Sequence, residues 1–188
     1  MDFLTEKSFE NINFNETTLS KGTYEQCSFT NCQFNGVDIS HFVFEECTFN
    51  QCDFSLCITG NTSFKEVLFN RCKLLGVHFE HCNPFLLQMT FKGCQLKLAS
   101  FYKLSLKNTL FEACNMQEAD FSMGDFSNTA FKHCDFSGAI FDNTNLRNCD
   151  FRSSYQFTID PEKNNIKKAK FDLSELPGLL QQYNIVVS

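Results

Sequence analysis

A large apolar side chain recurs at every fifth position along most of this 188-residue chain. The series runs from Phe9 to Phe79 with one interruption, at Thr59, and after a slip of two residues it resumes at Leu86 and continues to Phe151. A period of five fits neither the 3.6-residue repeat of an amphipathic helix nor the two-residue alternation of a half-buried strand. The pattern therefore indicates a solenoid.

A second, slimmer series accompanies the first. Two residues before most of the large positions stands a small side chain, and the other three positions of each unit are mostly polar. One large and one small inward residue in every five describe a chain that turns a corner at each unit, so that four units close a square coil. We therefore predict an all-β solenoid. The slim residues are Cys27, Cys32, Val37, Cys47, Cys52, Thr62, Val67, Cys72, Val77, Cys94, Ala99, Thr109, Cys114, Ala119, Gly124, Thr129, Cys134, Ala139, Thr144 and Cys149.

Individual units resemble a known repeat. Segments 119–123 (Ala-Asp-Phe-Ser-Met), 134–138 (Cys-Asp-Phe-Ser-Gly) and 149–153 (Cys-Asp-Phe-Arg-Ser) are similar to the pentapeptide-repeat consensus, in which Ala, Asp or Asn, and Leu precede two variable residues. The resemblance covers roughly residues 4–156. It implies a right-handed quadrilateral β-helix, which agrees with the corner argument, whereas periodicity alone does not decide the handedness.

Two interruptions fall within the ladder. Near residues 80–85 the register slips at a segment that contains Pro84, and because proline lacks a backbone donor we expect a bulge there with Phe85 exposed, a possible contact surface. A loop is expected near residues 155–165, followed by a last return to the ladder. A continuous repeat has no separate cores to divide, so residues 1–173 are predicted to form one β-helix domain.

The pattern changes over residues 174–188. Ser174 followed by Pro177 is typical of a helix N-cap and first turn, and apolar residues then recur at helical spacing. We predict a short C-terminal α-helix and a terminal strand at 185–187. Such a helix either caps the shaft or also forms a two-fold dimer interface, and we favour the dimer. Its interface residues would be Leu176, Leu179, Leu180 and Tyr183.

The C-terminal segment extends the resemblance. Residues 160–161, 169–171 and 179–187 are similar to the end of Qnr-type pentapeptide-repeat proteins, which protect DNA gyrase and topoisomerase IV from quinolones. This implies a tail-to-tail homodimer that forms a long acidic rod mimicking duplex DNA. The chain departs from that subgroup because no long loop is expected to project from the coils and because a basic band interrupts the acidic field. Topoisomerase binding is therefore better supported than protection against a drug.

The eleven cysteines are expected to be packing residues. All of them occupy the slim inward position, where a free cysteine behaves as a small hydrophobe. No Cys-x-x-Cys pair of the kind found in zinc sites is present. Because the chain also lacks a signal peptide and a long apolar run, the thiol content predicts a cytoplasmic protein with no membrane contact.

Catalytic chemistry is not indicated. His78, His81 and Cys82 form a string that could suggest a metal site, but both histidines flank the inward Phe79 and are expected to face solvent. No nucleophile–base grouping, phosphate loop or paired carboxylates stand out from the repeats. We therefore expect neither an enzyme nor a bound metal or cofactor.

Charge is banded along the chain. Residues 1–64 contain 9 acidic and 2 basic residues, and residues 65–111 contain 2 acidic and 7 basic residues. Residues 112–160 contain 8 acidic and 3 basic residues, and residues 161–188 contain 3 and 4, so that the whole chain has a net charge of −6. Many Asp and Asn residues precede a large residue, where they bond nearby backbone in turns. Glutamate has no such role. Stacking by one coil predicts an acidic ridge of Glu25, Glu45, Glu46 and Glu66, with Lys65 next to Glu45.

Two functions from different classes follow. The first is a non-catalytic DNA mimic that binds a bacterial type II topoisomerase through the acidic ridge and modulates or protects it. The alternative is a generic protein–protein interaction scaffold unrelated to DNA. A direct nucleic-acid binder is a weaker third hypothesis and would use Lys92, Lys97, Lys103 and Lys107.

Overall fold

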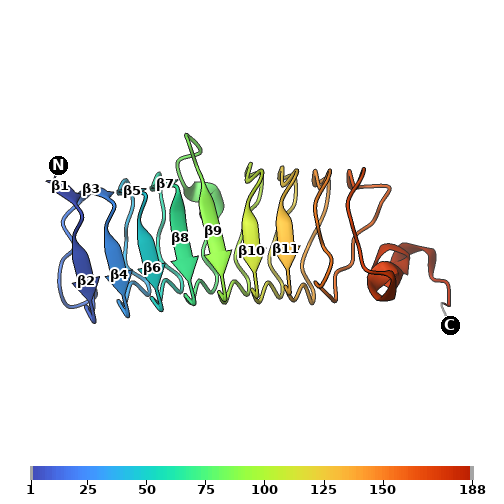
Figure 1. Ribbon diagram of the computed structural model, residues 1–188, viewed down its shortest axis with the longest axis horizontal. Coiled ribbons are helices and arrows are strands. Elements are labelled where there is room, and N and C mark those ends of the chain that lie inside the picture. Colours follow the sequence, from blue (N-terminus) through green and yellow to red (C-terminus); the bar gives the residue numbers. More distant parts are fainter. Residues whose placement is uncertain (1, 187–188) are drawn as a thin grey trace.

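Residues 2–186, which this computed structural model describes, form a rod with short parallel strands stacked along its length (Figure 1). One sheet has the order β1-β3-β5-β7, and the second has the order β11-β10-β9-β8-β6-β4-β2. The strands are β1 (Asp2–Thr5), β2 (Ser8–Glu10), β3 (Gly22–Glu25), β4 (Ser28–Thr30), β5 (Val43–Glu45), β6 (Thr48–Asn50), β7 (Ser63–Lys65), β8 (Val67–Asn70), β9 (Met89–Lys92), β10 (Leu110–Glu112) and β11 (Ala130–Lys132).

The register confirms the square coil. In the first sheet Tyr24 lies beside Phe44, and in the second Phe29 lies beside Phe49, in each case 20 residues further along. Single bridges with the same spacing join the other two sides, for example from Gln33 to Asp53. Four units of five residues therefore make one turn of a parallel β-solenoid, as the sequence predicts.

Aromatic rings fill the shaft in columns. Phe29 stacks on Phe49 with ring centroids 4.8 Å apart, and Phe91 stacks on Phe111 at 4.9 Å with the planes 3° apart. Rings on neighbouring sides meet edge to face instead, because the ring quadrupole favours that arrangement between rings at an angle. Repeated stacking explains why phenylalanine dominates the ladder. Phe42, which occupies a slim position and is also buried, was missed by the sequence pattern.

Most slim inward residues that carry a thiol or hydroxyl group make the same hydrogen bond to the preceding coil. The Cys52 thiol donates to the Phe29 carbonyl oxygen at 3.4 Å, and the Ser154 hydroxyl donates to the Phe131 carbonyl oxygen at 2.9 Å, each 23 residues earlier. All eleven cysteines are buried and free. Burial raises the pKa of Cys47 to about 12. The thiols therefore pack the shaft and tie each coil to the one before it.

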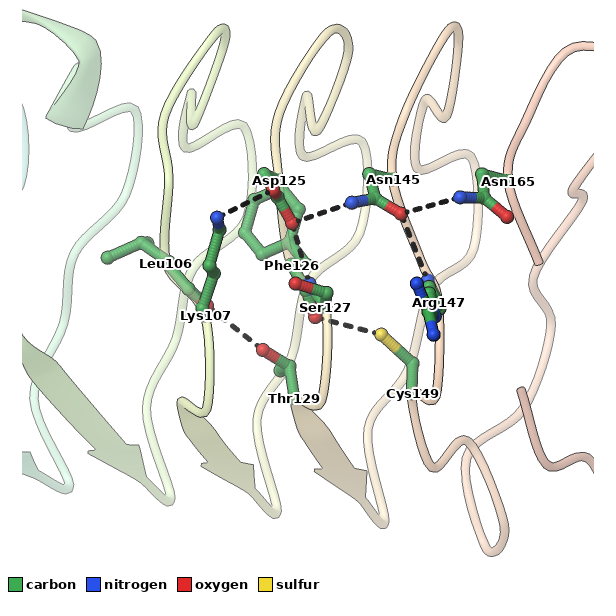
Figure 2. Close-up of polar contacts among 10 residues, drawn as sticks. All are labelled: Leu106, Lys107, Asp125, Phe126, Ser127, Thr129, Asn145, Arg147, Cys149 and Asn165. Atoms are coloured by element: carbon green, nitrogen blue, oxygen red, sulfur yellow. Dashed lines mark hydrogen bonds and ion pairs between the residues drawn. The ribbon is translucent and has the colours of Figure 1, made fainter. Parts of the chain in front are cut away.

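Short polar side chains stabilise the corners, as Figure 2 shows for one column. The Asp125 carboxylate accepts a hydrogen bond from the Ser127 amide at 3.0 Å and another from the Asn145 side-chain amide at 3.0 Å. Asn165 in turn donates to Asn145 at 3.0 Å, and the Lys107 ammonium lies 3.1 Å from Asp125. These residues are explained by corner geometry, as expected, and need no ligand.

The coil between β8 and β9 contains the predicted bulge. Phe69 pairs with Phe91, 22 residues later, so two extra residues project from the rod as the green loop in Figure 1. Phe85 is 67% exposed, in agreement with the prediction. Leu86, however, does not resume the ladder: it is 63% exposed, and its neighbour Leu87 packs against the core instead. The prediction for Leu86 was wrong because the loop shifts which residue faces inward before β9 restores the register. The turn before the loop is the 3-10 helix η1 (Phe79–His81).

The coils return after the second break. Asn165 pairs with Asn145, and Phe171 stacks on Phe151 with ring centroids 5.2 Å apart. Within the intervening loop Phe157 and Ile159 are buried. The last return to the ladder is therefore present, as predicted.

The C-terminal helix differs from the prediction in type. It consists of two 3-10 segments, η2 (Leu173–Leu179) and η3 (Gln181–Tyr183), rather than an α-helix. Pro177 lies inside η2, where in an α-helix its ring would clash with the carbonyl four residues earlier. Asp172 rather than Ser174 is the N-cap residue, and its carboxylate accepts a hydrogen bond from the Ser153 amide at 2.8 Å.

This helix covers the end of the shaft. The Ile159 amide donates to the Gly178 carbonyl oxygen at 3.0 Å, and Leu179 packs against the core. Gly178 has no room for a side chain, because a Cβ there would collide with the Phe157 carbonyl. Ile185 and Val186 are not in a strand, contrary to the prediction, and Val187 lies outside the described residues.

Candidate protein-interaction surface

The first column of the acidic ridge lies on the β3–β5–β7 sheet. Glu25 pairs in register with Glu45, and Glu45 pairs with Lys65, as the sequence predicts. The Lys65 ammonium is 3.0 Å from the Glu45 carboxylate. Glu45 is therefore neutralised by Lys65, and Glu25 is left as the net negative charge of this column.

The second column runs along the adjacent corner. Gln26, Glu46 and Glu66 all have left-handed backbone, with φ of 52°, 52° and 53°, and all three are exposed. The Gln26 amide nitrogen donates to the Glu46 carboxylate at 2.8 Å, so that one bond links two coils. Glu6 occupies the same corner one coil earlier, with φ of 52°. Glu6 was missed by sequence reasoning, although it lies 20 residues before Gln26.

The structure joins this ridge to the bulge. Gln88 lies opposite Lys65 and Glu66 in the next coil, because its amide donates to the Phe64 carbonyl oxygen at 2.9 Å and its carbonyl oxygen accepts from the Val67 amide at 3.0 Å. Glu46, Glu66, Leu86 and Gln88, together with Glu45, Lys65 and Leu87, line a hollow of about 180 Å³. The sequence places the ridge and the bulge separately, because the 20-residue spacing fails across the insertion. Pro84 and Phe85 are exposed beside this hollow but do not line it.

A different corner carries an apolar patch. Leu56, Ile58, Leu75 and Leu98 are 70%, 53%, 38% and 54% exposed. Leu56 lies ten residues, or two sides of the coil, from Glu46, so the patch and the ridge occupy opposite corners of the rod. Sequence reasoning missed this patch because it tracked the ladder positions and these residues lie between them.

The predicted dimer residues are only partly at the surface. Leu176 and Leu180 are half-buried, and Leu179 packs against the core of its own chain. Tyr183 is 49% exposed, and its hydroxyl donates to the Glu162 carboxylate at 2.9 Å. The most exposed apolar residues of this segment are Leu173, Ile185 and Val186.

The histidine string is divided between the surface and the core. His78 and His81 are exposed and their rings stack 5.4 Å apart, whereas Cys82 is buried. The His78 Nδ1 atom is 2.8 Å from a Glu80 carboxylate oxygen. Across residues 2–186 no group of three or more His, Cys, Asp or Glu side chains is arranged to hold a metal ion. The described helices are also all too short to cross a bilayer.

A four-sided parallel β-solenoid of five-residue units defines the class of this protein. Two family models match the sequence: a pentapeptide repeat region over residues 62–132, and pentapeptide repeats over residues 8–51, 27–58 and 130–154. Together they cover most of the chain, which therefore belongs to the pentapeptide-repeat proteins.

Solved structures of similar fold include two trypsin-treated forms of QnrB1, a plasmid-mediated fluoroquinolone resistance protein. One has a TM-score of 0.66 and 18% identity, and the alignment covers 98% of this chain and 99% of that chain. The other has a TM-score of 0.65 and 18% identity, with 96% and 98% covered. At this identity the likeness shows the fold. No curated protein matches the sequence.

Proposed function

We propose that this protein is a non-catalytic DNA mimic that binds the DNA-binding groove of a bacterial type II topoisomerase, either DNA gyrase or topoisomerase IV. The observation that carries the proposal is the stacking of the ridge glutamates in register along a rigid rod. The fold likeness to a fluoroquinolone resistance protein supports it. We further infer that the protein acts in the cytoplasm and belongs to the Qnr-type subgroup.

The spacing of the ridge suits this role. Successive coils place carboxylates about 4.8 Å apart along the rod, while one strand of duplex DNA carries one phosphate per about 3.4 Å of axis. A basic groove that attracts phosphates will also attract such a column. Glu25, Glu46 and Glu66 are the residues expected to act as phosphate surrogates, because Glu45 is paired with Lys65.

A dimer would lengthen the mimic. Two copies joined tail to tail through the C-terminal segment would form an isologous contact, the commonest kind in homo-oligomers. Leu173, at 83% exposed, and Val186, at 93% exposed, are the apolar side chains available for it. Replacing both by Glu should give a folded monomer in sedimentation. A wild-type protein that is monomeric at high concentration would show that the helix is a cap alone.

A supercoiling assay tests the enzyme partner. The wild-type protein should inhibit supercoiling by gyrase in a dose-dependent manner. Changing Glu25, Glu46 and Glu66 together to Lys should abolish that effect while leaving the fold intact, because exposed charges contribute little to stability. Changing Glu10, Glu16 and Glu118 to Lys makes a matched control, since it alters the net charge equally on other parts of the rod.

The alternative is a protein-interaction scaffold unrelated to DNA. The observation that favours it is the exposed apolar patch of Leu56, Ile58, Leu75 and Leu98. An interface centred on that patch would be only weakly sensitive to salt, whereas a phosphate mimic should lose affinity steeply as ionic strength rises. Unchanged supercoiling at a large molar excess of protein, with enzymes from several bacteria, would favour the scaffold.

A further inference from the structure

The hollow between the ridge and the bulge has two chemically different walls. Glu46 and Glu66, on successive coils, form the acidic wall, and Leu86 and Leu87 form the apolar wall. Its volume of about 180 Å³ suits one side chain rather than a folded element. A ligand that fits both walls must carry positive charge at one end and an aliphatic stem along its length.

Leu86 is placed where neither backbone preference nor burial favours leucine. Its φ is +56°, in the left-handed region where side chains other than Gly and Asn are strained, and it is 63% exposed. Leu87, next to it, already fills the inward position. An exposed leucine at the mouth of a hollow is therefore available to pack against an incoming side chain.

The charge of the hollow is negative. Among its lining residues Glu45 is compensated by Lys65, at 3.0 Å, which leaves the Glu46 and Glu66 carboxylates. Arginine matches this arrangement, because its guanidinium carries five N–H donors in a planar fork that can serve two carboxylates. Its methylene stem can lie along apolar surface while the charged head meets the acids.

We propose that this hollow, which we call the Glu–Leu socket and define by Glu46, Glu66, Leu86 and Gln88, receives an arginine side chain from an exposed segment of a partner protein. The inference deepens the proposed function and rests on it for the identity of the partner. It adds a directional contact at one end of a ridge that otherwise recognises charge alone.

The experiment uses the full-length, ¹⁵N-labelled protein and a blocked peptide, acetyl-Gly-Arg-Leu-Gly-amide. Amide chemical shifts should move at Glu46, Glu66 and residues 86–88 and saturate with peptide concentration. The same peptide with citrulline, the neutral isostere of arginine, should bind at least about fivefold more weakly. A lysine peptide should fall between the two, because lysine is a point charge without the fork.

Two variants and two matched controls complete the test. Glu66→Gln and Leu86→Ser should each weaken binding about fivefold. Glu112→Gln removes a half-exposed carboxylate elsewhere, and Leu98→Ser removes a leucine with similar exposure and φ of +60°, so both should bind the arginine peptide like the wild type. Equal thermal midpoints would show that all four variants are folded.

Shifts scattered over the rod, equal affinity for the citrulline peptide, or wild-type binding by both socket variants would overturn the proposal. No topoisomerase is present in this experiment, so the socket and the topoisomerase partner are tested independently. Peptide binding in a protein that does not affect supercoiling would keep the socket and reject the topoisomerase. Inhibition of supercoiling without peptide binding would keep the topoisomerase as the partner and reject the socket.

Discussion

Lys65 lies directly beside Glu45 in the parallel register, with its ammonium 3.0 Å from the Glu45 carboxylate. This ion pair ends the first column of the acidic ridge at the coil that precedes the bulge. Beyond it the Gln88 amide donates to the Phe64 carbonyl oxygen at 2.9 Å and Leu87 packs against the core, so no further charged residue extends the column. Lys65 therefore limits the negative charge that a partner meets.

Removing this cation should strengthen the ridge. Lys65→Gln frees the Glu45 carboxylate, and we expect affinity for gyrase at low salt to rise about two- to fivefold, the range expected for one exposed charge. The gain should disappear at high salt, where surface charges are screened. Binding measured at two ionic strengths checks this. An affinity lowered at both would mean that Lys65 itself contacts the partner.

The stacked rings should dominate stability. Phe121 and Phe131 are fully buried, so replacing either by Ala should lower the free energy of unfolding by about 3 to 5 kcal/mol. Phe85→Ala is the matched control, because Phe85 is 67% exposed and should change stability by less than about 0.5 kcal/mol. Denaturant unfolding measures all three. Losses under about 1 kcal/mol at both buried positions would contradict the inward register.

The cysteines should be unreactive in the native protein. All eleven are buried, so a bulky reagent cannot reach them, and burial also raises the pKa of Cys82 to about 12, so its reactive thiolate is scarce at neutral pH. A bulky thiol reagent should label the native protein slowly and the unfolded protein at all eleven sites. Mass spectrometry counts the labels. Rapid native labelling of several cysteines would argue against the shaft.

Low pH should remove the stabilising contribution of the ion pair between Asp150 and Arg152. Hydrogen bonds from the Arg152 guanidinium, at 2.9 and 2.6 Å, lower the pKa of Asp150. A carboxyl with a lowered folded-state pKa stabilises the protein above the unfolded value of about 3.9, and that stabilisation is lost as pH falls through the folded-state pKa. Asp150→Asn should therefore lose less stability than the wild type between about pH 5 and about pH 3. Identical losses in thermal melts would show that the pair contributes nothing.

The ladder could be predicted from the sequence because each inward residue repeats at a spacing that no helix or strand shares. The 20-residue spacing of Phe29, Phe49 and Phe69 alone predicts that they lie side by side in successive coils. Across the bulge counting fails, since the path of the loop decides that Leu87 rather than Leu86 faces inward. The same insertion hides the socket, because the two extra residues before β9 shift which residue lies opposite Lys65 and Glu66, and only the structure shows that it is Gln88.

The C-terminal helix shows a second limit. Apolar spacing around Leu179 predicts an α-helix, but Pro177 disfavours one, and the segment is a 3-10 helix with Gly178 packed against the Phe157 carbonyl. That contact joins residues from separate turns of the chain, which periodicity cannot reveal. The stacked glutamates, by contrast, follow directly from the repeat, so this part of the candidate site was predictable.

Competition with DNA tests the central claim most directly. A fluorescent DNA duplex bound to gyrase should be displaced by the wild-type protein, and the displacement should weaken as salt rises. The variant with Lys at Glu25, Glu46 and Glu66 should not displace it, whereas the variant with Lys at Glu10, Glu16 and Glu118 should displace it normally. No displacement at a large molar excess of wild-type protein, or equal displacement by both variants, would contradict DNA mimicry by the ridge.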